Sequence, residues 1–75
     1  MKNIIYTQTE SNQIELSIDN QIFFLEWDEI TFNTLIFDWS GEYINEVPYQ
    51  FNPNKGLDEY PNSEIINFIL DEIFV

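Results

Sequence analysis

Carboxylates are the most abundant chemically active side chains in this 75-residue chain. Fourteen Asp and Glu residues stand against two lysines, Lys2 and Lys55, without Arg, His or Cys, so the formal net charge is -12 at pH 7. A nucleophilic triad needs a base matched to neutral pH, which is usually His. A carboxylate pair could hydrolyse glycosides, but among fourteen acids some pair falls at any chosen distance by chance. We therefore expect no enzymatic activity.

Metal and cofactor chemistry has equally little support in the sequence. Without Cys there is no thiolate site and no redox chemistry, and two glycines, Gly41 and Gly56, are too few for a phosphate-binding loop. The oxygen-rich segment 52–59 departs from the calcium-binding EF-hand loop, because Gly56 stands at its fifth position and no Glu stands at its twelfth. We expect a polar turn in this segment, with no metal and no cofactor.

The excess of negative charge restricts the partners that the chain can bind. Proteins bind nucleic acids and anionic membranes through Lys and Arg, so two lysines against a charge of -12 exclude both as direct partners. Disorder is also a poor fit, because 44% of the residues are hydrophobic. We expect one folded domain over residues 1–75 whose acids face a basic protein. The sequence leaves the oligomeric state open.

Targeting segments are not predicted. The stretch from Met1 to Tyr6 has one basic residue, and polar Thr7 follows before an apolar signal-peptide core develops. No apolar run approaches the roughly 20 residues of a membrane span. We therefore expect the protein in the cytoplasm.

A hairpin over residues 13–27 is the clearest element that would position the acids. Polar and apolar residues alternate from Gln13 to Asp19, as in a half-buried strand. Asp19 and Asn20 tolerate the positive φ of a type I′ turn, and residues 21–27 are rich in β-formers. With a two-residue loop, positions whose numbers sum to 39 pair across the hairpin. The predicted core face holds Ile14, Leu16, Ile18, Phe23, Leu25 and Trp27, and the outer face holds Glu15, Ser17, Ile22, Phe24 and Glu26.

The segments on either side of the hairpin also favour strands. Residues 3–9 predict a first strand that turns near Ser11 and Asn12. Residues 30–39 are ambiguous, because β-branched and aromatic residues favour a strand while the apolar spacing also fits a helix. We favour the strand. A further strand over residues 42–47 would then pair with it across the turn Ser40–Gly41.

The chain ends in a predicted helix after a loop over residues 49–61. Asn62 is the predicted N-cap. An apolar stripe at helical spacing consists of Ile65, Ile66, Ile69, Leu70 and Ile73, and the opposite side carries Glu64, Asn67 and Asp71. The expected fold class is α+β: an antiparallel β-meander of four to five strands with one C-terminal α-helix packed on one face.

A charged surface can serve solubility alone, but acids that repel one another favour a surface selected for its electrostatic field. Asp71 and Glu72 stand near the negative end of the predicted helix dipole, where cations would be favoured. On the strand 42–47, Glu42 and Glu46 would share a face with Ile44 between them. Binding hot spots also need aromatic anchors, which the outer face and the turn supply. The predicted partner-binding residues are Glu15, Phe24, Glu26, Asp28, Glu29, Asp38, Trp39, Glu42, Tyr43 and Glu46.

A negative field of this size is suited to a basic partner. In size and charge alone the chain resembles the nucleic-acid-mimic inhibitors of phages and mobile elements, which include anti-restriction and anti-CRISPR proteins. The resemblance implies an inhibitor that occludes a nuclease or another nucleic-acid-binding protein. Two alternatives stay open. One is an immunity protein or antitoxin that neutralises a basic nuclease toxin, and the other is a non-inhibitory accessory subunit of a larger complex.

Overall fold

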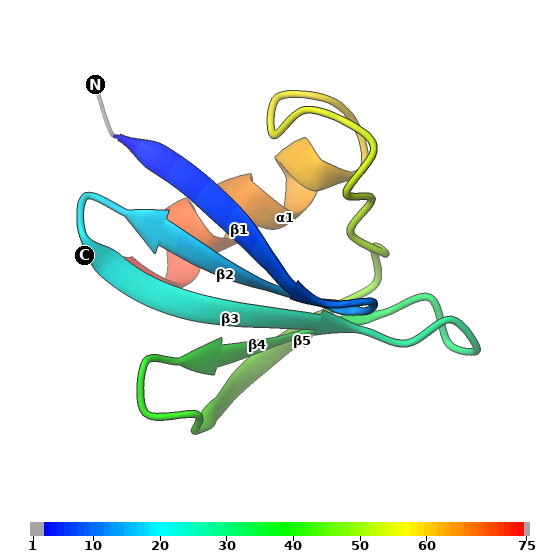
Figure 1. Cartoon of the computed structure of the whole chain (residues 1–75), viewed down its shortest axis with the longest axis horizontal. Helices are drawn as coiled ribbons and strands as arrows, with labels where there is room; N and C mark the ends of the chain where they lie inside the picture. The colour runs from blue at the N-terminus through cyan, green and yellow to red at the C-terminus, as the bar shows by residue number, and fades with distance from the viewer. Residues whose placement is uncertain (1–2, 75) are drawn as a thin grey trace.

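The computed structural model describes residues 3–74, which form an α+β fold. Five strands make one antiparallel sheet in the order β1-β2-β3-β4-β5, so each strand pairs with its neighbours in sequence (Figure 1). The strands are β1 (Ile4–Glu10), β2 (Gln13–Ile18), β3 (Gln21–Trp27), β4 (Thr34–Asp38) and β5 (Tyr43–Val47). Near the C-terminus, α1 (Asn62–Phe68) continues into a π-helical turn, η1 (Ile69–Ile73). The predicted meander with a C-terminal helix is confirmed.

The β2–β3 hairpin has the predicted register. Leu16 lies opposite Phe23, and Ile14 lies opposite Leu25. The two turn residues, Asp19 and Asn20, have φ values of 50° and 73°, as a type I′ turn requires. The side-chain carboxylate of Asp19 also accepts a hydrogen bond from the backbone N–H of Asn3 at 2.7 Å, which fastens the start of β1 to the turn.

One face of the sheet is covered by the helix and forms the core. All six residues predicted for the core face of the hairpin are buried, none of them more than 4% exposed. α1 and η1 lie behind the sheet in Figure 1 and contribute Ile65, Ile66 and Ile69 to the same core. Leu70 and Ile73 pack against its edge, so the apolar helix stripe is confirmed. Within residues 3–74 no helix has the length and the apolar character that crossing a membrane requires.

The ambiguous segment 30–39 forms a loop followed by a strand, as favoured. Residues 34–38 pair with both β3 and β5. The pairing of β4 with β5 contains a bulge, in which the register shifts between Ile36 and Phe37. Because of this bulge, Ile44 packs against the core, whereas Glu46 pairs with Leu35 on the other side of the sheet. The prediction that Glu42, Ile44 and Glu46 share a face is therefore wrong.

Buried polar side chains fasten the loop of residues 48–61 over one end of the core. The hydroxyl of Thr34 donates to the Tyr49 carbonyl oxygen at 2.5 Å and accepts the Phe51 N–H at 3.1 Å. Asn62 is fully buried, and its amide bonds to the N–H and the carbonyl oxygen of Asn52, each at 2.8 Å. The N-cap is Pro61, without a side-chain cap. The prediction of Asn62 as N-cap is wrong, because its side chain holds the loop instead.

Candidate protein-binding surface

The face of the sheet opposite the helix carries no covering element within the described residues (Figure 1). We call it the open face. Its central residues are aromatic: Phe24 of β3 pairs with Phe37 of β4, which in turn pairs with Tyr43 of β5. The rings of Phe37 and Tyr43 meet edge to face, with centroids 6.1 Å apart. Phe24 and Phe37 are half-buried, while Tyr43 is 54% exposed. These three rings form an aromatic row across the sheet.

Carboxylates frame the aromatic row. Glu15 of β2 lies opposite Phe24, and Glu26 and Glu46 lie on either side of Leu35. Diagonal neighbours on adjacent strands stand about 7–8 Å apart, which applies to Glu15 and Glu26. Glu26 and Glu46 are two strands apart, or about 10 Å. The open face thus presents three separated negative charges around an apolar centre.

Two ends of the sheet extend this acidic surface. At the end formed by the β3–β4 loop, Glu26, Asp28 and Glu29 line one open hollow of about 510 Å³, together with the apolar Ile30 and Leu35. The sequence grouped these three acids in one stretch, and the fold brings them around the same hollow. Their carboxylates are not gathered as metal ligands, since residues 3–74 contain no group of three or more such side chains that could hold a metal ion.

The opposite end is the β4–β5 turn, which Asp38 organises. Its carboxylate accepts hydrogen bonds from the Ser40 hydroxyl at 2.6 Å, the Ser40 N–H at 2.9 Å and the Glu42 N–H at 3.0 Å. The Ser40 hydroxyl and then the Glu42 N–H hold the pKa of Asp38 below its usual value, and desolvation opposes them. The turn leaves Trp39 74% exposed. Asp38 is thus a positioning residue for the exposed Trp39 and Glu42.

Glu46 is held in place by a neighbouring loop residue. Its carboxylate accepts a hydrogen bond from the Asn33 side-chain amide, and the Glu46 N–H donates to the Asn45 side chain at 2.7 Å. A carboxylate fixed in this way loses less side-chain entropy when a partner binds it. Glu46 is therefore a preorganised member of the acidic frame.

The ten predicted residues fall into three adjoining groups. The open face holds Glu15, Phe24, Glu26, Tyr43 and Glu46, the β3–β4 end adds Asp28 and Glu29, and the β4–β5 turn holds Asp38, Trp39 and Glu42. Phe37 and Leu35 were missed, although the alternation of β4 would have placed them beside Phe24 once its pairing with β3 was assumed.

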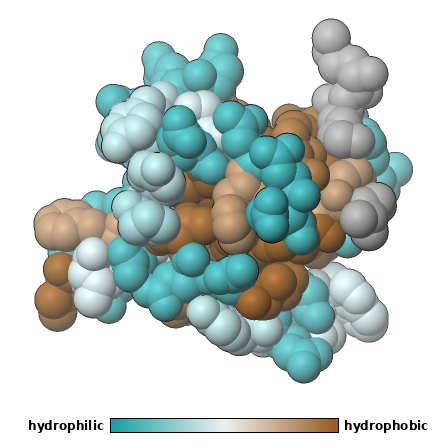
Figure 2. Space-filling view, turned by 180° about the vertical axis from the view of Figure 1, so that it is seen from behind, coloured by the Kyte–Doolittle hydropathy of each residue, from teal (hydrophilic) through white to brown (hydrophobic). Residues whose placement is uncertain are grey.

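The tip of the β3–β4 loop was also missed. Ile30 is 87% exposed and Phe32 is 60% exposed, and Phe32 has a positive φ of 63°. The Asp28 carboxylate accepts the Ile30 N–H at 2.7 Å, and the Asp28 carbonyl oxygen accepts the Phe32 N–H at 2.8 Å. Apolar atoms accordingly project at the edge of the molecule in Figure 2, where this loop lies. The turn therefore places two large apolar side chains in solvent.

Comparison with known protein families, with curated proteins and with solved structures finds no match to this chain.

Proposed function

We propose that the protein is a small inhibitor that binds a basic, nucleic-acid-handling surface of another protein and occludes it. The observation that carries this proposal is the aromatic row of Phe24, Phe37 and Tyr43, framed by separated carboxylates on an uncovered sheet face. The one lysine among the described residues, Lys55, lies in the 48–61 loop, where its ammonium donates to the Tyr60 carbonyl oxygen at 3.3 Å. Among residues 3–74, the frame therefore has no lysine beside it.

Arginine is the residue that complements such a surface. Its planar guanidinium stacks on aromatic rings and also pairs with carboxylates in a bidentate geometry. Surfaces that bind nucleic acids are rich in Arg and Lys, because these side chains contact phosphates. The open face offers the same side chains an alternative set of negative charges about 7–10 Å apart. A partner occupied in this way cannot bind nucleic acid at the same groups.

Net charge governs the rate of association with the partner. The aromatic row governs the lifetime of the complex. A net charge of -12 speeds association with a basic partner and makes it dependent on salt. Desolvated aromatic anchors supply most of the binding energy at protein interfaces. The proposal places this encounter in the cytoplasm, and it applies equally to a phage inhibitor and to an immunity protein for a nuclease toxin.

The test is capture of a partner from lysate of the source cell, followed by competition with nucleic acid. We expect the protein to capture a basic nucleic-acid-binding protein at low salt, to release it at high salt, and to inhibit its binding of nucleic acid. Capture of only acidic or uncharged partners, or capture that is indifferent to salt, would overturn the proposal.

A matched pair of variants locates the binding face. The open-face variant replaces Glu15, Glu26 and Glu46 with Gln, and the helix-face variant carries E64Q, D71N and E72Q. Both remove three exposed or half-exposed charges, so their net charges are equal. Because each interfacial charge pair contributes about 0.5–1 kcal/mol, we expect the open-face variant to bind about tenfold or more weakly than the helix-face variant. An equal loss of affinity in the two variants would show that binding depends on net charge alone and not on the open face.

The accessory-subunit alternative is favoured by one observation, the half-buried apolar side chains of Phe24, Leu35 and Phe37 on an uncovered face. An obligate apolar interface would bind independently of salt and would not compete with nucleic acid. The two functions therefore give opposite results in the same capture experiment.

A further inference from the structure

A second hollow lies on the side of the sheet opposite the open face. It encloses about 450 Å³ and is lined by aromatic side chains from three segments: Trp27 at the end of β3, Phe32 in the β3–β4 loop, and Tyr49, Phe51 and Tyr60 in the 48–61 loop. Trp27 and Phe51 are 4% and 1% exposed and form its floor, whereas Phe32 and Tyr60 are 60% and 64% exposed and form its rim. We call this site the aromatic hollow.

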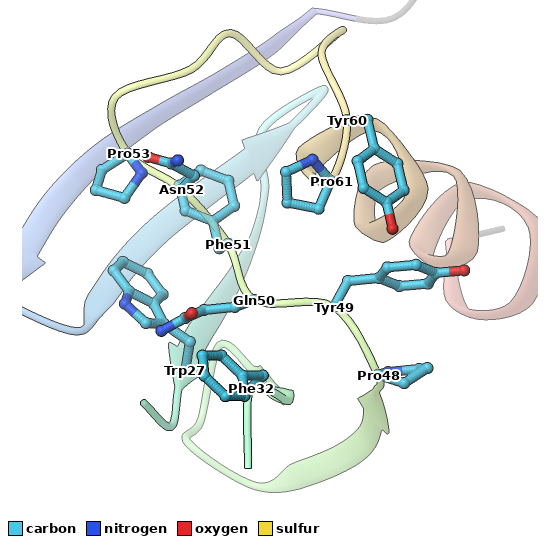
Figure 3. Close-up of a pocket in the computed structure, with 10 residues that line it drawn as sticks. All are labelled: Trp27, Phe32, Pro48, Tyr49, Gln50, Phe51, Asn52, Pro53, Tyr60 and Pro61. Carbon is cyan, nitrogen blue, oxygen red and sulfur yellow. The ribbon is translucent and has the colours of Figure 1, made fainter. Parts of the chain in front are cut away.

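The rings of the aromatic hollow stand on two sides of Gln50 (Figure 3). Figure 3 shows Trp27 and Phe32 on one side, Tyr49 and Tyr60 on the other, and the Gln50 side chain extending toward the first pair. Tyr49 and Tyr60 pack edge to face with centroids 5.9 Å apart. The accessible rings are therefore those of Phe32, Tyr49 and Tyr60, beside the Gln50 amide, which can accept or donate a hydrogen bond.

The loop that builds the hollow is fastened at several points. Besides the contacts of Thr34 and Asn62, the Tyr6 hydroxyl donates to the Pro53 carbonyl oxygen at 3.2 Å. The Tyr6 and Trp27 rings each lie 5.4 Å from the Phe51 ring. A site held in this way needs little ordering when a ligand enters.

Phe32 adds an independent indication that the rim is used. Its φ of 63° lies in the left-handed region, which is unfavourable for a bulky residue and concentrates at functional sites. Its side chain stays 60% exposed, so burial in the core does not explain the strained position. The strained backbone presents an aromatic ring at the edge of the hollow.

The electrostatic surroundings select the class of ligand. No acidic side chain of residues 3–74 lines the hollow. The Asp28 carboxylate accepts the Ile30 N–H and the Glu59 carboxylate accepts the Gly56 N–H, so the net charge of -12 supplies the negative field. Lys55, the lysine within residues 3–74, donates to the backbone of Tyr60 and is not part of the lining. Aromatic faces attract cations, and the field of the chain excludes anions.

We propose that the aromatic hollow is a binding site for an arginine side chain. A guanidinium suits it better than an ammonium, because it is planar, weakly hydrated and able to stack on rings while donating to Gln50. The aromatic hollow shares no residue with the open face. This inference therefore stands or fails separately from the proposed function.

The test uses the intact chain and its own tryptophan. Of two tryptophans, Trp27 and Trp39, the substitution W39F leaves Trp27 as the reporter in the hollow. We titrate this variant at low salt with N-acetyl-arginine amide and, separately, with N-acetyl-citrulline amide, which has a similar shape without the charge. We expect a saturable change in Trp27 fluorescence at millimolar concentrations of the arginine compound. The affinity for the citrulline compound should be at least tenfold weaker. No saturable change, or equal affinity for both compounds, would overturn the inference.

Substitutions of Tyr60 at the rim distinguish stacking of arginine on the ring from nonspecific electrostatic attraction to the acidic chain. In the W39F background, Y60F keeps the aromatic face and should bind arginine as before, whereas Y60L keeps apolar volume without it. We expect Y60L to bind about two- to fivefold more weakly, the range for a cation over an exposed ring. Circular dichroism and thermal melting check that both variants are folded. Equal affinity of the folded Y60F and Y60L variants would refute the role of the ring.

Discussion

The two faces of the sheet are built from the same alternating strands, yet their chemistry differs. On the covered face, Leu16 and Ile36 are fully buried among other aliphatic side chains. On the open face, Phe24 and Phe37 are half-buried beside carboxylates that have no cationic neighbour in their own sheet. Hydrophobic burial accounts for the covered face. The open face contains charges that repel one another, and a basic partner would explain why they are kept.

Truncating leucine on each face gives the largest expected contrast. Leu16→Ala on the covered face should cost about 3–4 kcal/mol, because it removes a buried side chain and leaves a cavity. Leu35→Ala on the open face should cost about 1 kcal/mol, because water can fill the space. Urea denaturation of both variants measures the free energy of unfolding. Equal losses would mean that the open face is as much a part of the core as the covered face.

The buried polar contacts on the covered side give the next effect. Asn62→Ala should lower the free energy of unfolding by about 2–3 kcal/mol, because the backbone groups of Asn52 lose their partners inside the protein. Asn67→Ala, at an exposed position of α1, is the control and should change stability by less than about 0.5 kcal/mol. Similar values for the two variants would contradict the assigned role of Asn62.

Local sequence patterns predicted the strand register of the hairpin, the conformation of its turn and the face on which each of its side chains lies. The register of β2 with β3, the positive φ of Asp19 and Asn20, and the sorting of Leu16 and Glu15 to opposite faces follow from local patterns. The bulge beside Ile44 was not predicted, because an extra residue in one strand interrupts the alternation without a local signature.

Long-range contacts account for the remaining differences. Asn62 has the residue type and position of an N-cap, but hydrogen bonds to residues 52–56 engage its side chain. The aromatic hollow joins side chains that are up to 33 positions apart, from Trp27 to Tyr60. No local sequence pattern predicts contacts between residues so far apart in the chain. Glu15, Phe24 and Glu26 of the open face were found because they follow the alternation of the β2–β3 hairpin, whereas Phe37 of β4 was missed.

The β3–β4 loop lies between the two faces and allows a smaller test. Phe32→Gly should raise the free energy of unfolding by about 1 kcal/mol, because glycine adopts a positive φ without strain. Ile30→Gly is the control, since Ile30 has no positive φ and glycine there only adds freedom to the unfolded chain. Thermal unfolding compares both with the wild type. Destabilisation by Phe32→Gly would mean that the ring contributes to packing.

The smallest expected effect concerns the turn beside the open face. Hydrogen bonds from Ser40 and Glu42 lower the pKa of Asp38, so its stabilising contribution is present above the unfolded value of about 3.9 and is lost as the pH falls through the folded value. The difference in unfolding free energy between the wild type and D38N should therefore be constant near neutral pH and shrink below about pH 4. A difference independent of pH would contradict this role.

The most direct test of the open face is a carboxyl footprint of the captured complex. Carbodiimide labelling with mass spectrometry reports the accessibility of individual Asp and Glu side chains, free and bound. The account predicts that binding of the basic partner protects Glu15, Glu26 and Glu46, while Glu64, Asp71 and Glu72 on the helix side stay labelled as in the free protein. Protection of the helix-side acids with unchanged labelling of Glu15, Glu26 and Glu46 would contradict it.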